Sequence, residues 1–177
     1  MKKNFKELLA DVKAFVFDVD GVFTDGTVIL HPAGELLRTS NTRDGYAVHV
    51  AVERGFPIAI ISGGKSEAVR QRFKGLGVTD IYLGVTDKVD ALEDFRFKYG
   101  IELSQILYMG DDLPDYEVLQ KVGIPTCPLD AAPEIKQISA YISSYAGGKG
   151  CVRDVIEQVM RSQQKWAGQE ITGIKAD

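Results

Sequence analysis

Phe15-Val16-Phe17-Asp18-Val19-Asp20-Gly21-Val22, near the amino terminus, is the stretch that decides the fold. The apolar, partly β-branched run that ends at Phe17 predicts a short strand buried on both faces of a sheet. Two carboxylates follow it, with one residue between them, and Gly21 permits a sharp turn. In an open parallel sheet the ligand crevice lies at the carboxyl ends of the strands, so Asp18 and Asp20 are expected at a functional edge. Taken alone, an Asp-Gly pair after a strand indicates only a turn, and the interpretation depends on the rest of the chain.

Strand-like and helix-like segments alternate along the rest of the sequence. Strands are expected at 58–61, 80–83, 106–109 and 124–127, and helices at 5–12, 46–54, 67–76, 88–99, 116–122 and 152–165. Two further strands, at 27–30 and 35–39, are joined by a turn that contains both Pro and Gly and form a hairpin. This alternation requires crossover connections, so the predicted fold is α/β, a doubly wound, mostly parallel sheet with a small β-hairpin insertion after strand 1. One domain is expected over 1–165, with the insertion at 24–40 and a C-terminal tail at 166–177.

The composition is that of an ordinary soluble protein. The chain has 177 residues, 45% of them hydrophobic, which suits one domain with a core. Its net charge of −4 argues against a nucleic-acid partner, and no apolar run is long enough for a membrane span. The first residues lack the apolar core of a signal peptide, so a cytoplasmic location is expected. Cys127 and Cys151 are interpreted as reduced packing residues, and with only two histidines a zinc site or histidine triad is not expected.

Polar residues follow three of the predicted strands at the edge where their carboxyl ends meet. Asp18 and Asp20 follow the first strand, Ser62 the second, and Asp111 with Asp112 the fourth. Carboxylates that converge in this way repel one another unless a cation lies among them, and an oxygen-only ligand set suits Mg²⁺. Lys88 begins the helix after the third strand and can reach the same edge, and Ser62 opens a loop at a helix amino terminus that can bind an anion. Together these groups indicate phosphoryl transfer.

Each of these residues also has an ordinary structural interpretation. Ser62 can be a helix cap, Lys88 a solvated surface residue, and Asp115 a favourable charge at a helix start. The functional interpretation therefore depends on their occurrence as a set.

As a set, these motifs resemble the haloacid dehalogenase superfamily of phosphatases over nearly the whole chain. The resemblance rests on Asp18-Val19-Asp20-Gly21, Ser62, Lys88 and Gly110-Asp111-Asp112-Leu113-Pro114-Asp115, in order and spacing. It implies that Asp18 is a nucleophile that forms an aspartyl-phosphate, that Asp20 is the general acid and base, and that Ser62 and Lys88 hold the phosphoryl group. It further implies that Asp18, the backbone oxygen of Asp20, and Asp111 bind Mg²⁺, with Asp112 and Asp115 in the outer shell.

Within that superfamily the chain resembles the phosphatases of 3-deoxy-D-manno-octulosonate 8-phosphate, which act in lipopolysaccharide sugar synthesis. The resemblance rests on Thr24-Asp25-Gly26, Asn41-Thr42-Arg43-Asp44-Gly45 and the late Gly147-Gly148-Lys149-Gly150-Cys151-Val152-Arg153. The implied substrate-binding residues are Asp20, Asn41, Thr42, Arg43, Asp44, Gly45, His49, Gly63, Gly64, Arg72 and Lys88. Gly64 departs from the pattern, because the family commonly has Arg there, and His49 stands where a basic residue is common. Arg72 matches another basic position. Related enzymes for a nine-carbon keto-deoxy sugar phosphate carry Glu at the place of Gly64. Because this chain has no Glu there, the resemblance favours the eight-carbon sugar as substrate.

No insertion of domain size covers the expected site, so the resemblance implies a capless enzyme in which a neighbouring subunit forms the lid. A homo-oligomer is expected, a tetramer by resemblance, and the tail is a candidate to reach a neighbour's site. Two alternatives remain outside the phosphatases. A response-regulator receiver also gathers acidic residues and a lysine around Mg²⁺, but its lysine comes last, whereas Lys88 precedes Asp111. A non-catalytic assembly module, like the capless domain attached to sialic-acid-activating enzymes, is disfavoured by the full catalytic set.

Overall fold

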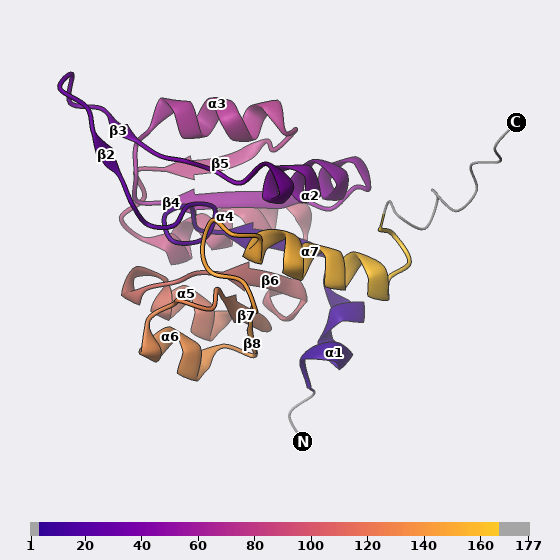
Figure 1. Cartoon of the computed structure of the whole chain (residues 1–177). Coiled ribbons are helices and arrows are strands. Elements are labelled where there is room, and N and C mark those ends of the chain that lie inside the picture. The colour runs from indigo at the N-terminus through magenta and orange to yellow at the C-terminus, as the bar shows by residue number, and fades with distance from the viewer. Residues whose placement is uncertain (1–3, 167–177) are drawn as a thin grey trace, which may run out of the picture.

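The fold of the computed structural model, which describes residues 4–166, is built around a six-stranded sheet in which every strand pairing is parallel. Its strands are β1 (Ala14–Phe17), β4 (Ile58–Ser62), β5 (Asp80–Leu83), β6 (Ile106–Met109), β7 (Ile124–Cys127) and β8 (Tyr141–Ile142). They lie in the order β5-β4-β1-β6-β7-β8, so β1 is central (Figure 1). The predicted α/β, doubly wound, parallel sheet is confirmed.

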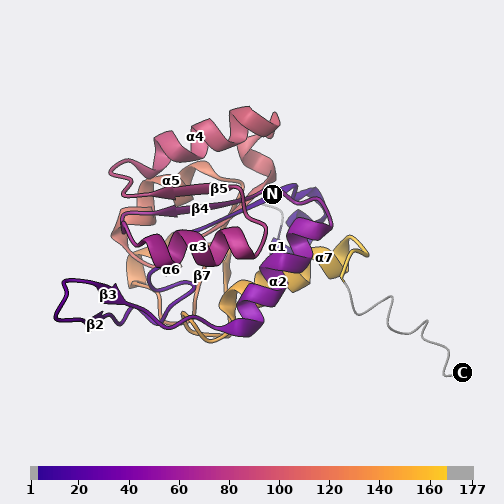
Figure 2. The ribbon, with the colours of Figure 1, turned by 90° about the horizontal axis from the view of Figure 1, so that it is seen from above.

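Helices cover both faces of the sheet (Figure 2). One face packs against α2 (Thr42–Glu53), α3 (Glu67–Gly75) and α7 (Cys151–Ser162), and the other against α4 (Lys88–Tyr99), α5 (Tyr116–Lys121) and α6 (Pro133–Ile138). The short helical segments are α1 (Phe5–Leu8), η1 (Leu9–Asp11), η2 (Leu103–Gln105) and η3 (Leu113–Asp115). None of the helices in the described residues is long and apolar enough to cross a membrane.

Strand β1 contributes alternate side chains to the two cores. Phe15 and Phe17 join the core under α2 and α7, whereas Ala14 and Val16 join the core under α4 and α5. All four are fully buried. Burial of a large apolar side chain contributes about 1.5 to 3 kcal/mol, so the apolar run fixes the strand firmly between two helical layers. The first polar residue, Asp18, is thereby held at the edge of the sheet.

The hairpin insertion projects away from this body in both views (Figures 1 and 2). Its strands, β2 (Ile29–Leu30) and β3 (Leu36–Leu37), are shorter than predicted and pair antiparallel. Their apolar side chains are exposed, and Leu30 retains 77% of its accessible surface. The base of the hairpin returns the chain to the carboxyl edge of the main sheet.

Three local predictions need correction. Helix α2 begins at Thr42 and not at 46, because Asn41 caps it by accepting a hydrogen bond of 2.8 Å from the backbone N–H of Arg43. Helix α6 and strand β8 were missed, since the first is six residues long and the second only two. Trp166, assigned to the tail, is buried in the core beside α7, and the remainder of the predicted tail lies outside the described residues.

Candidate active site

The carboxyl ends of β1, β4 and β6 bring the predicted catalytic residues together. Phe17 pairs with Ile60 of β4 and with Met109 of β6, so the residues that follow these strands emerge side by side. The backbone N–H of Asp18 continues the ladder by donating to the carbonyl of Met109 over 3.1 Å. Lys88, the first residue of α4, approaches the same edge.

Three carboxylates form the centre of the site. Asp18, Asp111 and Asp115 each offer an oxygen atom, and these atoms lie within 4.8 Å of one another. Asp18 and Asp115 are buried. Two glycines permit the close approach, because a Cβ atom at Gly21 would collide with the carboxylate of Asp111 and one at Gly110 with that of Asp115.

Lys88 lies between two of these carboxylates. Its Nζ is 2.7 Å from Oδ1 of Asp115 and 3.1 Å from Oδ1 of Asp18, and its side chain is only 8% exposed. Burial lowers the pKa of the ammonium, but the charges of Asp18 and Asp115 outweigh burial and raise that pKa overall. Lys88 is therefore positively charged and fixed beside the predicted nucleophile.

Asp115 is held by donors on several sides. Besides Lys88, the hydroxyl of Tyr108 donates to its Oδ1 over 2.7 Å, and the backbone N–H of Asp111 donates to its Oδ2 over 3.2 Å. Tyr108 is fully buried in β6. Asp115, which was predicted for the outer shell of the metal, thus links Tyr108 of β6 to Lys88 through its carboxylate.

The charge balance of the cluster fits a divalent cation. Burial and the neighbouring Asp115 raise the pKa of Asp18 to about 8, although Lys88 opposes the rise. Burial, Asp115 and Asp112 raise the pKa of Asp111 to about 7. Within residues 4–166, Lys88 is the only side chain that forms ion pairs with this cluster, and carboxylates this close repel one another, so a cation among them would relieve the repulsion. An oxygen-only set of this kind suits Mg²⁺.

Ser62 and Asp20 line one small cavity together with Arg38 and Gly64. The hydroxyl of Ser62 is buried and accepts a hydrogen bond of 3.1 Å from the backbone N–H of Gly64. The carboxylate of Asp20 faces Arg38, whose Nε lies 2.6 Å from Oδ1 and whose Nη2 lies 3.1 Å from Oδ2. Arg38 was not predicted as a site residue. The only signal in the sequence was its position just after the hairpin strand, where the chain returns to the sheet edge.

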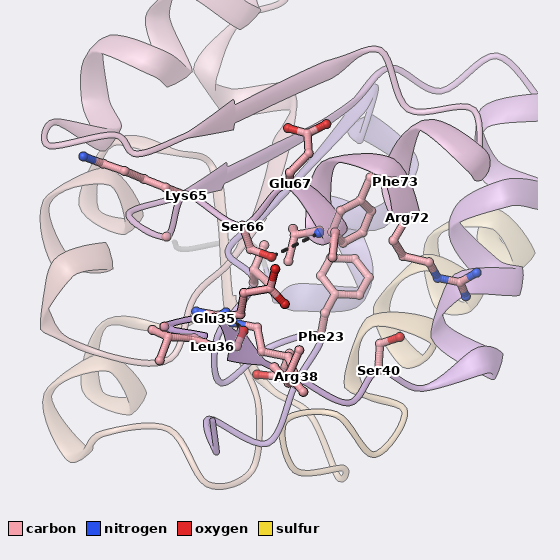
Figure 3. A pocket seen from close by; sticks show the side chains of 17 residues that line it. Phe23, Glu35, Leu36, Arg38, Ser40, Lys65, Ser66, Glu67, Arg72 and Phe73 are labelled. Atoms are coloured by element: carbon pink, nitrogen blue, oxygen red, sulfur yellow. Dashed lines mark hydrogen bonds between the residues drawn. The ribbon is translucent and has the colours of Figure 1, made fainter. Parts of the chain in front are cut away.

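A pocket of about 540 Å³ lies between the hairpin and α3, and Arg38, the partner of Asp20, lines it (Figure 3). Phe23 and Phe73 line it, with ring centroids 4.7 Å apart. The remaining side chains are mixed in charge. The charged residues that line it are Arg38, Lys65, Arg72, Glu35 and Glu67. Of the predicted substrate residues, Gly64 and Arg72 border this pocket.

None of residues 41–45 lines the pocket between the hairpin and α3. Asn41 is the N-cap of α2, and Thr42 is its first residue. Arg43 lines a separate pocket of about 500 Å³ beside α7. Gly45 lies so close to Arg72 that a Cβ atom there would collide with the guanidinium. Asp44 is fully buried, and its Oδ1 accepts a hydrogen bond of 2.8 Å from the backbone N–H of Arg153 in α7. Burial raises the pKa of Asp44, and its Oδ2 has no hydrogen-bond partner in the described structure. Asp44 thus caps α7 from outside that helix.

The other predicted residues are exposed. His49 lies on α2 with its Nε2 3.4 Å from Glu53, and Gly63 lies in the loop after Ser62. Asp112 accepts a hydrogen bond of 2.8 Å from the backbone N–H of Leu113, at the start of η3. The structure therefore brings Asp18, Lys88, Asp111 and Asp115 into direct contact range and leaves His49 and Asp112 at the surface.

Comparisons with known proteins identify the family. A model of haloacid dehalogenase-like hydrolases matches residues 74–155. The 3-deoxy-D-manno-octulosonate 8-phosphate phosphatase of Escherichia coli is 36% identical over 155 residues, which cover 88% of this chain and 82% of that protein. The Moraxella catarrhalis phosphatase, solved with magnesium, phosphate and the octulosonate sugar, has a TM-score of 0.90 and 32% identity over 96% of this chain and 97% of that one.

A second solved structure supports the same assignment. The Haemophilus influenzae phosphatase, solved with cobalt, has a TM-score of 0.86 and 30% identity over 89% of this chain and 92% of that one. Sequence and fold therefore agree over almost the whole length. The chain belongs to the haloacid dehalogenase-like hydrolases and is a phosphoric monoester hydrolase.

Proposed function

We propose that the chain is a Mg²⁺-dependent phosphatase that converts 3-deoxy-D-manno-octulosonate 8-phosphate to the free sugar and phosphate. The observation that carries the chemistry is the cluster of Asp18, Asp111 and Asp115 around Lys88. The substrate follows from relatives of that name at 36% identity and from the Moraxella catarrhalis structure with its magnesium, phosphate and sugar.

In the first half of the reaction, a carboxylate oxygen of Asp18 attacks phosphorus while the bond from phosphorus to the sugar oxygen breaks. Asp20 gives its proton to the departing sugar oxygen, and Asp18 becomes an aspartyl-phosphate. In the second half, water attacks that phosphorus, Asp20 takes the water proton, and the Asp18 carboxylate is released with inorganic phosphate. Lys88, 3.1 Å from Asp18, and Ser62 are suited to hold the phosphoryl oxygens.

The proposed metal ligands are Asp18, the backbone oxygen of Asp20, and Asp111, with Asp112 and Asp115 behind them. When bound, the cation supplies positive charge that neutralises the phosphoryl group and the neighbouring carboxylates. The raised pKa values of Asp18 and Asp111 support this assignment, because both groups need a positive neighbour to be ionised near neutral pH.

The pocket between the hairpin and α3 is the proposed site for the sugar. Its volume of about 540 Å³ supports this, as do two residues in its lining, Gly64 and Arg38, the second of which contacts Asp20. Lys65 and Arg72 are candidates to meet the sugar carboxylate, since no arginine stands at Gly64. Of the segment predicted to bind substrate, we retain Asn41, Thr42, Arg43 and the buried Gly45 as candidates, together with the exposed His49. Asp44 is assigned mainly to the packing of α2 on α7.

We also propose that a neighbouring copy covers this open site, as in a homo-oligomer, for which a tetramer is the expected size. Exposed apolar side chains on the hairpin support an interface there; Ile29 is 58% and Leu30 77% exposed. A surface of this kind is costly to leave in water.

The function is tested by phosphate release from a panel of eight-carbon and nine-carbon keto-deoxy sugar phosphates, with Mg²⁺ and with a chelator. Fastest turnover of the eight-carbon ester, lost with the chelator, is expected. Asp18→Asn keeps the shape of the side chain but removes the nucleophile, so turnover should fall by about a thousandfold or more. Undiminished turnover in that variant would refute the mechanism, and preference for a nine-carbon ester would refute the substrate.

A further inference from the structure

Arg38 forms hydrogen bonds with the side chain of Asp20, the proposed general acid and base. Two nitrogen atoms of its guanidinium donate to two different oxygens of Asp20, over 2.6 Å and 3.1 Å. The hydrogen bond to Asp20 raises the pKa of Arg38, so the arginine is charged. Such a two-point contact fixes both the position and the plane of a carboxylate.

The guanidinium is itself held from the other side. Its remaining nitrogen, Nη1, donates over 2.8 Å to the carbonyl of Leu36 in β3, and the Arg38 side chain is only 11% exposed. The base of the hairpin therefore carries a preoriented arginine, one of the side chains that line the pocket in Figure 3.

Gly64 leaves room for this arrangement. A Cβ atom there would lie 3.4 Å from Oγ of Ser62, 3.5 Å from Nη2 of Arg38 and 3.7 Å from Oδ2 of Asp20. A long side chain at this position would start between Arg38, Asp20 and Ser62. A Cβ atom alone would make ordinary van der Waals contacts with these three side chains, and Gly64 places no longer group between them.

Asp20 depends on this contact for its orientation. Its side chain is 38% exposed, and within residues 4–166 Arg38 is the only residue that donates a hydrogen bond to its carboxylate. A carboxylate so exposed would otherwise rotate freely.

We propose that Arg38 is a positioning residue that holds the carboxylate of Asp20 in place as the base for hydrolysis of the phosphorylated Asp18. This inference rests on the proposed mechanism and concerns its second half, in which water attacks phosphorus and its proton passes to Asp20. The first half needs no proton from Asp20 when the leaving group is stable as an anion, so with such a substrate it does not depend on the orientation of Asp20. Loss of Arg38 should therefore slow the second half selectively.

The test is a single turnover of p-nitrophenyl phosphate with enzyme in excess and Mg²⁺ present. Release of p-nitrophenolate, which leaves without a proton, reports phosphorylation of Asp18, and the later release of inorganic phosphate reports its hydrolysis. In Arg38→Gln we expect phosphate release to slow about tenfold or more, because complete loss of a positioned base lowers a rate by up to about 10²- to 10⁴-fold. The rate of p-nitrophenolate release should stay within about twofold of wild type. Arg38→Lys keeps the positive charge but cannot make the two-point contact, so its rate of phosphate release should lie between those of wild type and Arg38→Gln.

A double-mutant cycle tests whether Arg38 acts through Asp20. Combining Arg38→Gln with Asp20→Asn should slow phosphate release no further than Asp20→Asn alone. Arg96→Gln is the matched control, because Arg96 makes a similar contact of 2.7 Å to Glu93 on the surface of α4, and it should leave both rates unchanged. Urea unfolding of each variant checks that the fold is kept.

Three results would overturn the inference. Equal slowing of both product releases would make Arg38 a general structural or phosphoryl-binding residue. Multiplying effects in the double variant would show that it acts without Asp20. Unchanged single-turnover rates with a raised KM for the keto-deoxy sugar phosphate alone would assign it to the substrate carboxylate. A wild-type enzyme that turns over no phosphate ester would refute the proposed function together with this inference.

Discussion

Lys88 donates to Asp115 over 2.7 Å, and both side chains are buried at the carboxyl edge of the sheet. The contact joins the first residue of α4 to the loop after β6, two segments 27 positions apart. It also explains why Asp115, and not the more exposed Asp112, lies in the carboxylate cluster. Tyr108 completes the arrangement from below by donating to the same oxygen of Asp115.

Tyr108→Phe is expected to destabilise the protein without changing its shape. The substitution removes one donor to a buried, charged acceptor, and hydrogen bonds to charged groups contribute about 1.5 to 3 kcal/mol. Urea unfolding should show a loss in that range. The matched control is Tyr82→Phe, which removes a hydrogen bond of equal length, 2.7 Å, from an exposed acceptor, Asp94, and should cost clearly less. Equal losses in the two variants would contradict a special role for the buried network.

Mg²⁺ is expected to stabilise the folded protein through the carboxylate cluster. A ligand at a hundred times its dissociation constant adds about 2.7 kcal/mol to the free energy of unfolding. Thermal unfolding with and without Mg²⁺ measures this gain, and Asp111→Asn should lose most of it because it removes a proposed ligand. Asp90→Asn makes the same change on the exposed first turn of α4 and should keep the gain. A gain that survives in Asp111→Asn would place the metal elsewhere.

The sheet and its catalytic edge were predictable because their signals are local. The buried run before Asp18 and the apolar run before Ser62 have no polar face, so they could be read as core strands. The short elements after 130 could not, since β8 is defined by pairing with β7 and not by its own composition. Arg38 escaped notice for a related reason: its partner Asp20 is 18 positions away, and their contact depends on how the hairpin folds back. Asp44 likewise has a local sequence typical of a loop, and only the packing of α2 on α7 shows that it is a cap.

Asp44→Ala is expected to weaken the junction of α2 and α7. The substitution leaves the backbone N–H of Arg153 without its acceptor in a buried position, and loss of a helix cap costs about 0.5 to 2 kcal/mol. Chemical unfolding should show a loss within that range, because the Asp44 side chain is fully buried. Asp25→Ala is the matched control, since Asp25 accepts a backbone hydrogen bond of 2.9 Å from Thr27 in an exposed loop, and should have a smaller effect. An unchanged stability of Asp44→Ala would remove its structural role and return it to the candidates for substrate binding.

Asp80 should make the stability of the fold depend on pH only in the acidic range. Its buried carboxylate accepts hydrogen bonds from Lys98 over 2.6 Å, from Tyr99 over 2.6 Å and from Thr79 over 2.9 Å. Burial raises the pKa of Asp80, but these donors outweigh burial and hold the pKa below its ordinary value. A carboxyl group whose pKa is lower in the folded state contributes stability above its unfolded pKa of about 3.9, and loses that contribution as the pH falls through its folded pKa.

We therefore expect the free energy of unfolding of wild type to exceed that of Asp80→Asn by about 1 kcal/mol at neutral pH. The difference is modest because Lys98 is half exposed. The difference between the two proteins, measured by urea unfolding, should be constant from about pH 5 to 8 and shrink below about pH 4. Comparison with the variant cancels the titration of the active-site carboxylates, which both proteins share. A difference that already disappears near pH 6, or that grows as the pH falls, would show that Asp80 does not titrate below its ordinary range.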